Sequence, residues 1–586
     1  MADALNHFPL RDRAVRAARG LAPFDVLLTG ARVADMATGE LRAADLGLVG
    51  PLIASVHAAG HRADAAIRHH LPGRILAPGL IDTHMHVESS MVTPRRYAET
   101  VLPQGTTTVC WDPHELGNVA GLDGVRWAIA ASRGLPLRTL VLAPSCVPSA
   151  PGLERAGASF GPDDMAEMLR WPEIAGVAEV MDMRGVLERS ALMRGIVGAG
   201  LASGKLVCGH ARGLSGGELQ GFAAAGIGSD HEITSGADLL EKLRAGLTVE
   251  LRGSHDYILP EAVAALNALP RYPQTLTLCT DDVFPDELVA RGGMIDLLRR
   301  LVRYGMPALE ALRAATLNAA MRLGRGDLGL LAPGRRADIA VLSDLGTLGV
   351  EMVFADGVRV AAAGRMAVAL PEADPPGLRD SMKLAPLSPA DFRIAARGTS
   401  ARLRTVSQPR FTRWGEISAP VRGGFAELPP EATMLAVTHR HGLAAPRPVL
   451  SVLEGWGAWR GALATTVAHD SHNLCVFGHD PADMAAAANA LIACGGGMAV
   501  ASGGRVRAVL ELPVAGLVSD APAAEVAAHF AALRDAADAI ADWLPPYRVF
   551  KAVVGASLAC NAGPHVTDRG IADGATGEMI PAALLG

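Results

Sequence analysis

Two histidines, His84 and His86, stand one residue apart in the segment LIDTHMHVE at residues 80–88. If this segment is a strand, alternate side chains point to the same face, so both imidazoles would project from one wall. Two such nitrogens can bind one metal ion or an adjacent pair. A strand with two polar residues on a solvated face would give the same spacing, because a lone His-x-His motif is not specific. The apolar residues 74–80 favour a buried strand.

Strands that alternate with helical segments follow this motif along the chain. Apolar or β-branched strands recur at intervals of about 20 to 40 residues, with segments of helical composition between them, as in βα units. Eight strand–helix units predict a closed (β/α)8 barrel. The alternative, an open doubly wound sheet, would carry an early glycine-rich phosphate turn, and this sequence has none. We expect the eight strands at residues 80–88, 106–111, 139–143, 176–180, 205–210, 226–231, 247–251 and 275–281.

Most of the predicted strands end in a polar residue. In a barrel the C-terminal ends of the strands meet at one mouth, where active sites are built. Any one of these residues could be polar only because it meets solvent. Four histidines and two carboxylates in equivalent positions together indicate a metal site. These six residues are His84, His86, Glu179, His210, His231 and Asp281, and Asp112 ends a further strand.

The number of these ligands predicts two metal ions rather than one, because six ligands exceed a tetrahedral site. Two cations about 3.5–4 Å apart make a hydroxide nucleophile available at neutral pH. The implied chemistry is attack of hydroxide on an electrophilic carbon, as in amide hydrolysis or deamination of a heterocycle. Imidazole and carboxylate ligands suit zinc, iron, manganese and nickel alike. We expect Glu179 to bridge the ions, with His84, His86 and Asp281 on one side and His210 and His231 on the other.

Other polar residues lie close to these strand ends or far along the chain. Asp112, His114 and Glu115 would orient a substrate, or would form a capping turn around Pro113. Residues 88–90 would support the ligands or cap a turn. The segment His-Asp-Ser-His at 469–472 folds over the barrel mouth, closing the site or holding another ion, or is a polar surface turn. We expect catalytic roles for Asp281, His231 and Glu115, and substrate contacts from Glu88, Ser90, Asp112, His114, Asp282 and His472.

The segment PGLIDTHMH at residues 78–86 resembles the first-strand motif of the amidohydrolase superfamily. Further motifs resemble the adenine deaminases, one family within that superfamily, and they continue well past the barrel. Jointly these motifs are very specific. They lie at residues 86–91, 111–115, 145–148, 178–182, 208–210, 230–232, 278–282 and 469–473.

This resemblance implies a barrel, a β domain built from two parts of the chain, a distinct C-terminal domain and a homodimer. It also implies a binuclear metal site, with Mn²⁺ foremost and Fe²⁺ or Zn²⁺ as alternatives. Glu179 stands where many superfamily members carry a carboxylated lysine. The implied activity is metal-dependent hydrolytic deamination of adenine to hypoxanthine and ammonia. The polar segment 252–257 departs from the commoner pattern of the family and leaves the substrate detail open.

Two other functions fit the same residues. One is an amidohydrolase that acts on another cyclic amide or amidine. The other is a non-catalytic barrel that binds a ligand and has kept the fold. Loss of one of the six ligands would favour the non-catalytic barrel, and all six are present.

The length of 586 residues exceeds a single core and predicts several domains. Short strands between residues 24 and 56 and again after residue 338 are expected to join in one β domain. The predicted fold is therefore α/β, a (β/α)8 barrel with a composite β-sandwich domain and a C-terminal α/β domain. We expect the β-sandwich at 1–77 and 333–375, the barrel at 78–332, and the C-terminal domain at 385–586.

Composition and charge exclude several classes of partner. A net charge of −6 argues against nucleic acid, which favours a basic stripe. The seven cysteines form no Cys-x-x-Cys motif and no disulfide framework. The apolar stretch 484–501 is interrupted by Asn489 and by glycines 495–497, so we interpret it as a buried helix and a turn. Because residues 1–20 do not form a secretory signal, we expect a cytoplasmic protein with a small-molecule substrate and no membrane contact.

Overall fold

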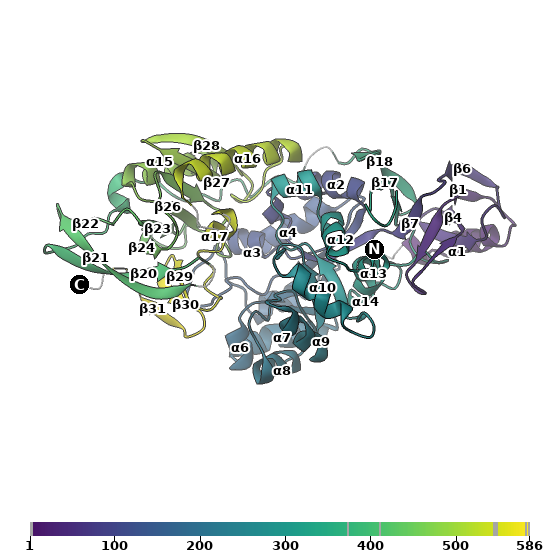
Figure 1. Ribbon diagram of the computed structural model, residues 1–586, viewed down its shortest axis with the longest axis horizontal. Helices are drawn as coiled ribbons and strands as arrows, with labels where there is room; N and C mark the ends of the chain where they lie inside the picture. Colours follow the sequence, from purple (N-terminus) through teal and green to yellow (C-terminus); the bar gives the residue numbers. More distant parts are fainter. Residues whose placement is uncertain (1–3, 372–373, 410–411, 543–548, 581–582, 584–586) are drawn as a thin grey trace.

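The computed structural model describes the chain except residues 1–3, 372–373, 410–411, 543–548, 581–582 and 584–586. Figure 1 shows three parts in a row. The N-terminal sheets lie at one end, a body of strands and helices lies in the middle, and a second sheet with its helices lies at the other end. The mouth of the middle part faces the C-terminal part, so both can contribute to one site.

Eight parallel strands occupy the centre of the described chain. The first five form one sheet and the last three another. Backbone hydrogen bonds connect the two sheets, from Gly228 N to Val207 O (3.0 Å) and from Asp281 N to His84 O (3.1 Å). The arrangement is a TIM-like barrel. Its strands are β8 (Leu80–Met85), β9 (Thr106–Trp111), β10 (Arg138–Ala143), β11 (Ile174–Val180), β12 (Leu206–Gly209), β13 (Ser229–Asp230), β14 (Thr248–Arg252) and β15 (Leu276–Cys279).

Helices follow the strands and pack outside them. In α12, for example, Ile295, Leu298 and Leu301 form an apolar stripe that is buried in the core. The amphipathic pattern explains why these segments form covering helices. The principal helices are α2 (Pro94–Val101), α3 (His114–Ala120), α4 (Leu122–Ser132), α5 (Pro162–Leu169), α7 (Ala191–Ser203), α8 (Gly216–Ala224), α9 (Gly236–Arg244), α10 (Leu259–Asn267) and α12 (Met294–Arg303).

The first barrel strand is shorter than the sequence predicted. Strand β8 ends at Met85, and residues Glu88–Ser90 form a 3-10 turn that ends at Met91, whose φ is 56°. Before the strand, Gly79 separates it from β7 (Ile75–Pro78). A Cβ atom on Gly79 would lie 2.2 Å from Oγ1 of Thr107, so only glycine allows this close approach to β9. The close contact at Gly79 therefore fixes where the chain enters the first barrel strand.

Strands from before and after the barrel form a common sheet, as the sequence predicted. The seven-stranded sheet has the order β19-β18-β17-β16-β7-β2-β3, and a four-stranded sheet has the order β5-β4-β1-β6. Side chains of both sheets share one core, which includes Leu46, Leu76 and Phe354. The strands are β1 (Phe24–Thr29), β2 (Arg32–Asp35), β3 (Glu40–Ala43), β4 (Asp45–Val49), β5 (Leu52–His57), β6 (Ala65–His70), β16 (Ile339–Leu342), β17 (Val350–Ala355), β18 (Val358–Ala362) and β19 (Arg365–Met366).

The C-terminal part is built on a nine-stranded sheet in the order β22-β21-β20-β24-β23-β26-β25-β27-β28. Helix α15 (Pro481–Cys494) packs on this sheet, and α16 (Ala523–Ile540) packs on α11 (Pro285–Arg291) of the barrel. At that contact the rings of Phe530 and Phe284 lie 5.3 Å apart. The strands are β20 (Ser400–Ser407), β21 (Arg413–Arg422), β22 (Phe425–Ala426), β23 (Ala432–Thr438), β24 (Val449–Glu454), β25 (Ala462–Thr465), β26 (Leu474–Gly478), β27 (Gly497–Ser502) and β28 (Arg505–Glu511).

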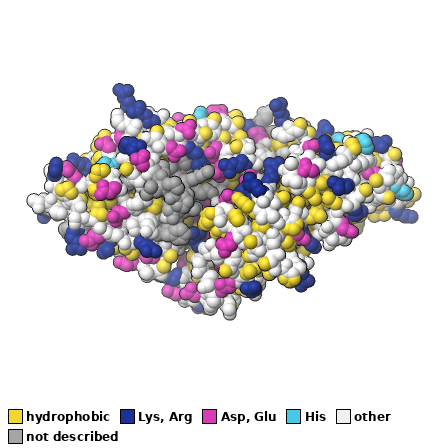
Figure 2. Space-filling model, in the orientation of Figure 1, with side chains coloured by type: hydrophobic (Ala, Val, Ile, Leu, Met, Phe, Trp, Pro, Cys, Tyr) yellow, Lys and Arg dark blue, Asp and Glu magenta, His cyan; other side chains and the backbone are white. Residues whose placement is uncertain are grey.

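The charge distribution on the surface and the length of the helices concern two expected absences, a nucleic acid partner and a membrane contact. Basic and acidic side chains are interspersed over the face seen in Figure 2. In the described part of the chain, no helix combines the length and the apolar character needed to cross a bilayer. The apolar stretch 484–501 forms most of helix α15, a glycine turn and part of β27.

Candidate active site

The six predicted ligands lie together at the barrel mouth, with Glu179 at their centre. Its Oε1 atom lies 3.6 Å from His84 Nε2 and 3.5 Å from His86 Nε2. Its Oε2 atom lies 2.7 Å from His210 Nδ1 and 3.3 Å from His231 Nε2. One carboxylate therefore faces two pairs of imidazoles, one pair with each oxygen. This is the geometry that a carboxylate bridge between two ions requires.

Asp281 closes the cluster on the side of the first histidine pair. Its Oδ1 atom lies 3.6 Å from His84 Nε2 and 3.4 Å from His86 Nε2. Asp281 has a φ of 55°, a left-handed conformation that residues other than glycine seldom adopt. Such strain is concentrated at functional sites, where surrounding contacts hold it in place.

Several buried nitrogens of this cluster make no hydrogen bond within the described chain. They are both ring nitrogens of His84, Nε2 of His210 and Nδ1 of His231. In contrast, His86 Nδ1 lies 3.0 Å from the Asp112 carbonyl oxygen, which leaves Nε2 to face the carboxylates. A second hydrogen bond of this kind is typical of histidines that bind metal. Unpaired imidazole nitrogens beside ionised carboxylates fit divalent cations.

The carboxylates of the cluster are held in their ionised form. Burial opposes ionisation, but the charge of His231 and hydrogen bonds from His210 and His231 hold the pKa of Glu179 well below its usual value. Burial likewise opposes ionisation of Asp281, and the neighbouring Arg252 guanidinium holds its pKa well below the usual range. Both groups therefore present negative charge at neutral pH.

Arg252, at the end of β14, is a member of the site that the sequence did not identify. It forms ion pairs with Asp281 and with Glu232. Its Nε atom donates to Ser254 Oγ (2.7 Å), and Ser254 in turn donates to Asp281 Oδ2 (3.0 Å). Arg252 thereby fixes the outer oxygen of Asp281 while the inner oxygen faces the histidines. The only sequence signal was the unusually polar segment that begins at residue 252.

Asp230, next to His231, has a different role from its neighbour. Asp230 and Lys242 are both fully buried, and their charged groups lie 2.8 Å apart. Asp230 also accepts hydrogen bonds from the backbone nitrogens of Ala211 (2.6 Å) and Glu232 (3.2 Å). These bonds tie together the loops that carry His210 and His231. Asp230 is thus a structural partner of the ligands.

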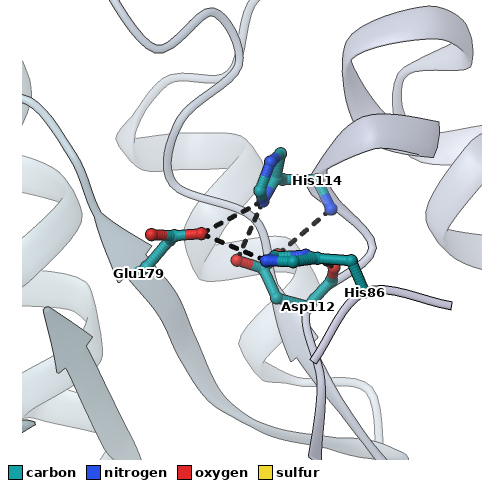
Figure 3. A group of neighbouring side chains, drawn as sticks. All are labelled: His86, Asp112, His114 and Glu179. Carbon is teal, nitrogen blue, oxygen red and sulfur yellow. Dashed lines mark hydrogen bonds and ion pairs between the residues drawn. The ribbon is translucent and has the colours of Figure 1, made fainter. Parts of the chain in front are cut away.

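Asp112 and His114 extend the cluster, as Figure 3 shows. His114 Nδ1 lies 3.1 Å from Asp112 Oδ2 and 3.6 Å from Glu179 Oε1. Asp112 also accepts a hydrogen bond from the backbone nitrogen of His114 at the start of α3. The capping turn and the functional interpretation are therefore compatible. Four buried donors, those of His86, Asp112, His114 and Glu179, lie within 4.8 Å of one another.

Of the other residues predicted to contact substrate, Glu88 and Ser90 hydrogen-bond to neighbouring protein groups, whereas Asp282 lies on a cavity wall. Glu88 accepts hydrogen bonds from Trp111 Nε1 (2.8 Å) and from the Leu116 backbone nitrogen (3.3 Å). Ser90 donates to the carbonyl oxygen of Val87 (2.6 Å), so it supports the turn after the ligands. Asp282 accepts from Ser89 Oγ (2.6 Å) and lies on the wall of a cavity.

The C-terminal segment 469–472 does fold over the barrel mouth. His469 Nδ1 lies 3.9 Å from Glu115 Oε1, and His472 Nε2 lies 3.7 Å from Glu115 Oε2. His472 is fully buried behind Glu115, whereas His469 borders the cavity. The surface-turn interpretation of this segment is therefore wrong, because its polar side chains are enclosed between two domains.

The cavity beside the cluster has a charged side and an apolar side. The charged side belongs to the barrel and carries both positive and negative groups, while the C-terminal part adds the polar residues Thr412, Asn561 and His565. The apolar side comes mostly from the C-terminal part, which covers the mouth. Its lining includes His210, Arg212, Glu232, Arg252, Ser254, His255, Asp282 and Phe284 from the barrel, and Trp456, His469, Ala552, Val554, Ala556 and Leu558 from the C-terminal part.

Comparison with known proteins agrees with this arrangement. Residues 75–360 match the amidohydrolase family, and residues 409–578 match the adenine deaminase C-terminal domain. Adenine deaminase 2 of Rhizobium meliloti (strain 1021) is 62% identical over 98% of this chain and 97% of its own length.

The chain belongs to the adenine deaminase family. Within this family, the enzyme of Klebsiella pneumoniae (strain 342) is 56% identical over 97% of this chain and 95% of its own length. The adenine deaminase of Moorella thermoacetica is 40% identical over 89% of this chain and 90% of its own. The predicted resemblance is therefore confirmed, and it covers both the barrel and the C-terminal part.

Proposed function

We propose that this chain catalyses the hydrolytic deamination of adenine to hypoxanthine and ammonia. The observation that carries the proposal is the Glu179 carboxylate, which presents one oxygen to each of two histidine pairs beside Asp281. Membership of the adenine deaminase family over nearly the full length supports the substrate. The carbon that bears the amino group of adenine is the electrophile for the attack inferred above.

We propose two divalent cations at the site, with Mn²⁺ foremost and Fe²⁺ or Zn²⁺ as alternatives. When bound, such a pair supplies an acidified water molecule as the nucleophile. The unpaired imidazole nitrogens and the ionised carboxylates support this donor set. The proposed ligands are His84, His86, Glu179, His210, His231 and Asp281.

Asp281 is the proposed proton acceptor when water adds to the purine. Arg252 holds Asp281 Oδ2, so the proton would be taken by the oxygen that faces the histidines. Removing this proton favours formation of the tetrahedral centre, and its return from Asp281 to the amino group would let that group leave as ammonia. His231 and Glu115 are proposed to assist catalysis, and substrate contacts are proposed for Glu88, Ser90, Asp112, His114, Asp282 and His472.

The finer description of the protein is also a proposal. We propose a closed (β/α)8 barrel at residues 78–332, a composite β-sandwich at 1–77 and 333–375, and a C-terminal α/β domain at 385–586. The two sheets that share a core support the sandwich. A homodimer and a cytoplasmic location are proposed from the family resemblance. We propose no nucleic acid partner, which the small net charge supports.

The direct test is ammonia release from adenine by protein reconstituted with Mn²⁺. Adenosine, guanine and cytosine are the comparison substrates, each at the same concentration. We expect release from adenine and little from the others. Release from adenosine but not from adenine would refute the substrate. Release from none of them, with metal bound, would favour another cyclic amidine or amide, or a barrel that only binds its ligand.

A further inference from the structure

A second group of potential metal ligands lies between the barrel and the C-terminal part. His114 and Glu115 come from the start of α3, and His469 comes from the loop between β25 and β26. One donor atom of each lies within 4.8 Å of the other two. None of its three members is one of the six proposed ligands, although His114 Nδ1 lies 3.6 Å from Glu179 Oε1 and so adjoins that site. It joins residues that are more than three hundred positions apart in the sequence.

Three polar atoms in and beside this group are buried and lack hydrogen bonds within the described chain, whereas His469 is partly exposed and Glu115 Oε1 accepts a hydrogen bond from Ser89 Oγ (3.2 Å). Among the residues that the structure describes, His114 Nε2, Glu115 Oε2 and Asp470 Oδ2 make none. His114, Glu115 and Asp470 are each no more than 2% exposed. Leaving a buried polar atom unpaired is unfavourable, so three such atoms in one place indicate a partner that the protein itself does not supply.

The orientation of His114 suits a cation on the side of Glu115. Its Nδ1 atom hydrogen-bonds to Asp112 Oδ2 (3.1 Å), which fixes the proton on that nitrogen. Its Nε2 atom, on the opposite side of the ring, lies 3.5 Å from Asp470 Oδ1. Asp470 Oδ1 also lies 3.3 Å from His469 Nδ1. Histidines that bind metal commonly have this arrangement, with one nitrogen on the ion and the other on a carboxylate.

The charge of the group is not balanced by a basic side chain. Within the described residues, the ion pairs of Glu115 and Asp470 involve only histidines, and neither carboxylate meets an arginine or a lysine. Two buried carboxylates therefore need either protons on the histidines or a bound cation. Two imidazoles and two carboxylates form a donor set for a divalent transition-metal ion.

We propose that His114, Glu115 and His469, with Asp470 beside them, bind a third divalent cation, separate from the pair held around Glu179. This cation links the C-terminal loop 469–472 to helix α3 at the wall of the active site. The site does not depend on which purine, if any, the enzyme converts.

The test counts manganese on the full-length protein. Protein stripped with a chelator is dialysed against Mn²⁺ to saturation, and bound metal is measured by mass spectrometry. We expect three equivalents per chain for the wild type, two for His469→Ala and one for Glu179→Gln. The matched control is His479→Ala, a half-buried histidine of the same domain whose Nδ1 contacts the Ala432 carbonyl oxygen. It should retain three.

The test is decided by the difference of one manganese equivalent per chain between the wild type and His469→Ala. Equal metal content in these two proteins would overturn the proposal and would mean that protons on the histidines balance the charge. If the proposed binuclear site did not bind manganese, both proteins would bind fewer ions, but the wild type would still bind one more than His469→Ala. Failure of the proposed function would appear only as absent ammonia release, so the three outcomes are distinguishable. Circular dichroism and the unfolding midpoint of each variant verify that it is folded.

Discussion

Two buried carboxylates at the barrel mouth, Glu179 and Asp230, are treated in opposite ways by the surrounding chain. Asp230 is neutralised by Lys242 at 2.8 Å and accepts two backbone hydrogen bonds. Glu179 faces five histidines, and several of their nitrogens are unpaired. Both carboxylates are almost completely inaccessible to solvent.

This difference separates a group that stabilises the fold from a group that binds a ligand. A buried ion pair that the protein completes by itself needs nothing further. A buried cluster of donors that the protein leaves incomplete is completed by a cation. A group of each kind occurs side by side in the sequence, at Asp230 and His231, so residue type alone does not show which group binds a cation. The contacts that each group makes in the folded protein show it.

The largest expected effect is on activity, from Glu179→Gln. The neutral amide cannot serve as an anionic bridge, so we expect ammonia release from adenine to fall by at least about 10³-fold. The measurement is kcat/KM of the manganese-reconstituted enzyme. In metal-free protein, the unfolding midpoint of this variant should stay close to that of the wild type. Retained activity would mean that Glu179 does not hold the ions.

The second effect is on stability, from Lys242→Met. Removing the lysine leaves the Asp230 carboxylate buried without its partner, which should cost about 3–5 kcal/mol of unfolding free energy. Chemical denaturation of the metal-free protein measures this loss. The double variant Lys242→Met with Asp230→Asn should recover part of it, because the stranded charge is gone. Wild-type stability in the single variant would contradict the comparison.

Metal removal should have a somewhat smaller effect on stability. At a free concentration ten times the dissociation constant, each bound ion adds about 1.4 kcal/mol, so the two ions proposed around Glu179 together add about 2.8 kcal/mol. Chelation should therefore lower the unfolding midpoint of the wild type, and re-addition of Mn²⁺ should restore it. The Glu179→Gln variant should respond much less. A chelator response of equal size in both proteins would locate the stabilising metal elsewhere.

The smallest expected effect comes from Arg252→Lys. Lysine keeps the charge but cannot pair with Asp281 and Glu232 at once through a planar fork. We expect kcat/KM to fall by about 10-fold, which corresponds to about 1.4 kcal/mol, with two ions still bound around Glu179. If the variant instead lost those ions, Arg252 would be needed to hold the metal ligands in place and not only to orient Asp281 as the proton acceptor.

The barrel and its six candidate ligands could be predicted from the sequence because the relevant signals are local. Each strand is an apolar or β-branched run, as in β9, and each ligand lies in or just after the last residues of its strand. The common sheet could be predicted from the strands that flank the barrel. The Asp356–Gly357 pair suits the turn between β17 and β18, because both residues adopt positive φ angles there.

The partners of the other charged residues could not be predicted, because they come from distant positions. Nothing near Asp230 in sequence indicates that Lys242 on α9 reaches back to it. The pairing of Arg252 with Asp281 depends on neighbouring strands of the barrel. The contact of His114 with Asp470 depends on how two domains dock. These contacts decide which carboxylates remain available for a cation, so the sequence indicated candidates and the fold distinguishes among them.

The central claim is that the two oxygens of Glu179 hold two different ions. Crystals grown with Mn²⁺ and measured at the manganese absorption edge test it directly. Around Glu179 the account predicts two anomalous peaks, one beside Oε1 with His84, His86 and Asp281, and one beside Oε2 with His210 and His231, in addition to the separate peak expected at His114, Glu115 and His469. A single peak around Glu179, or peaks with the Glu179 side chain turned away from the histidines, would contradict it.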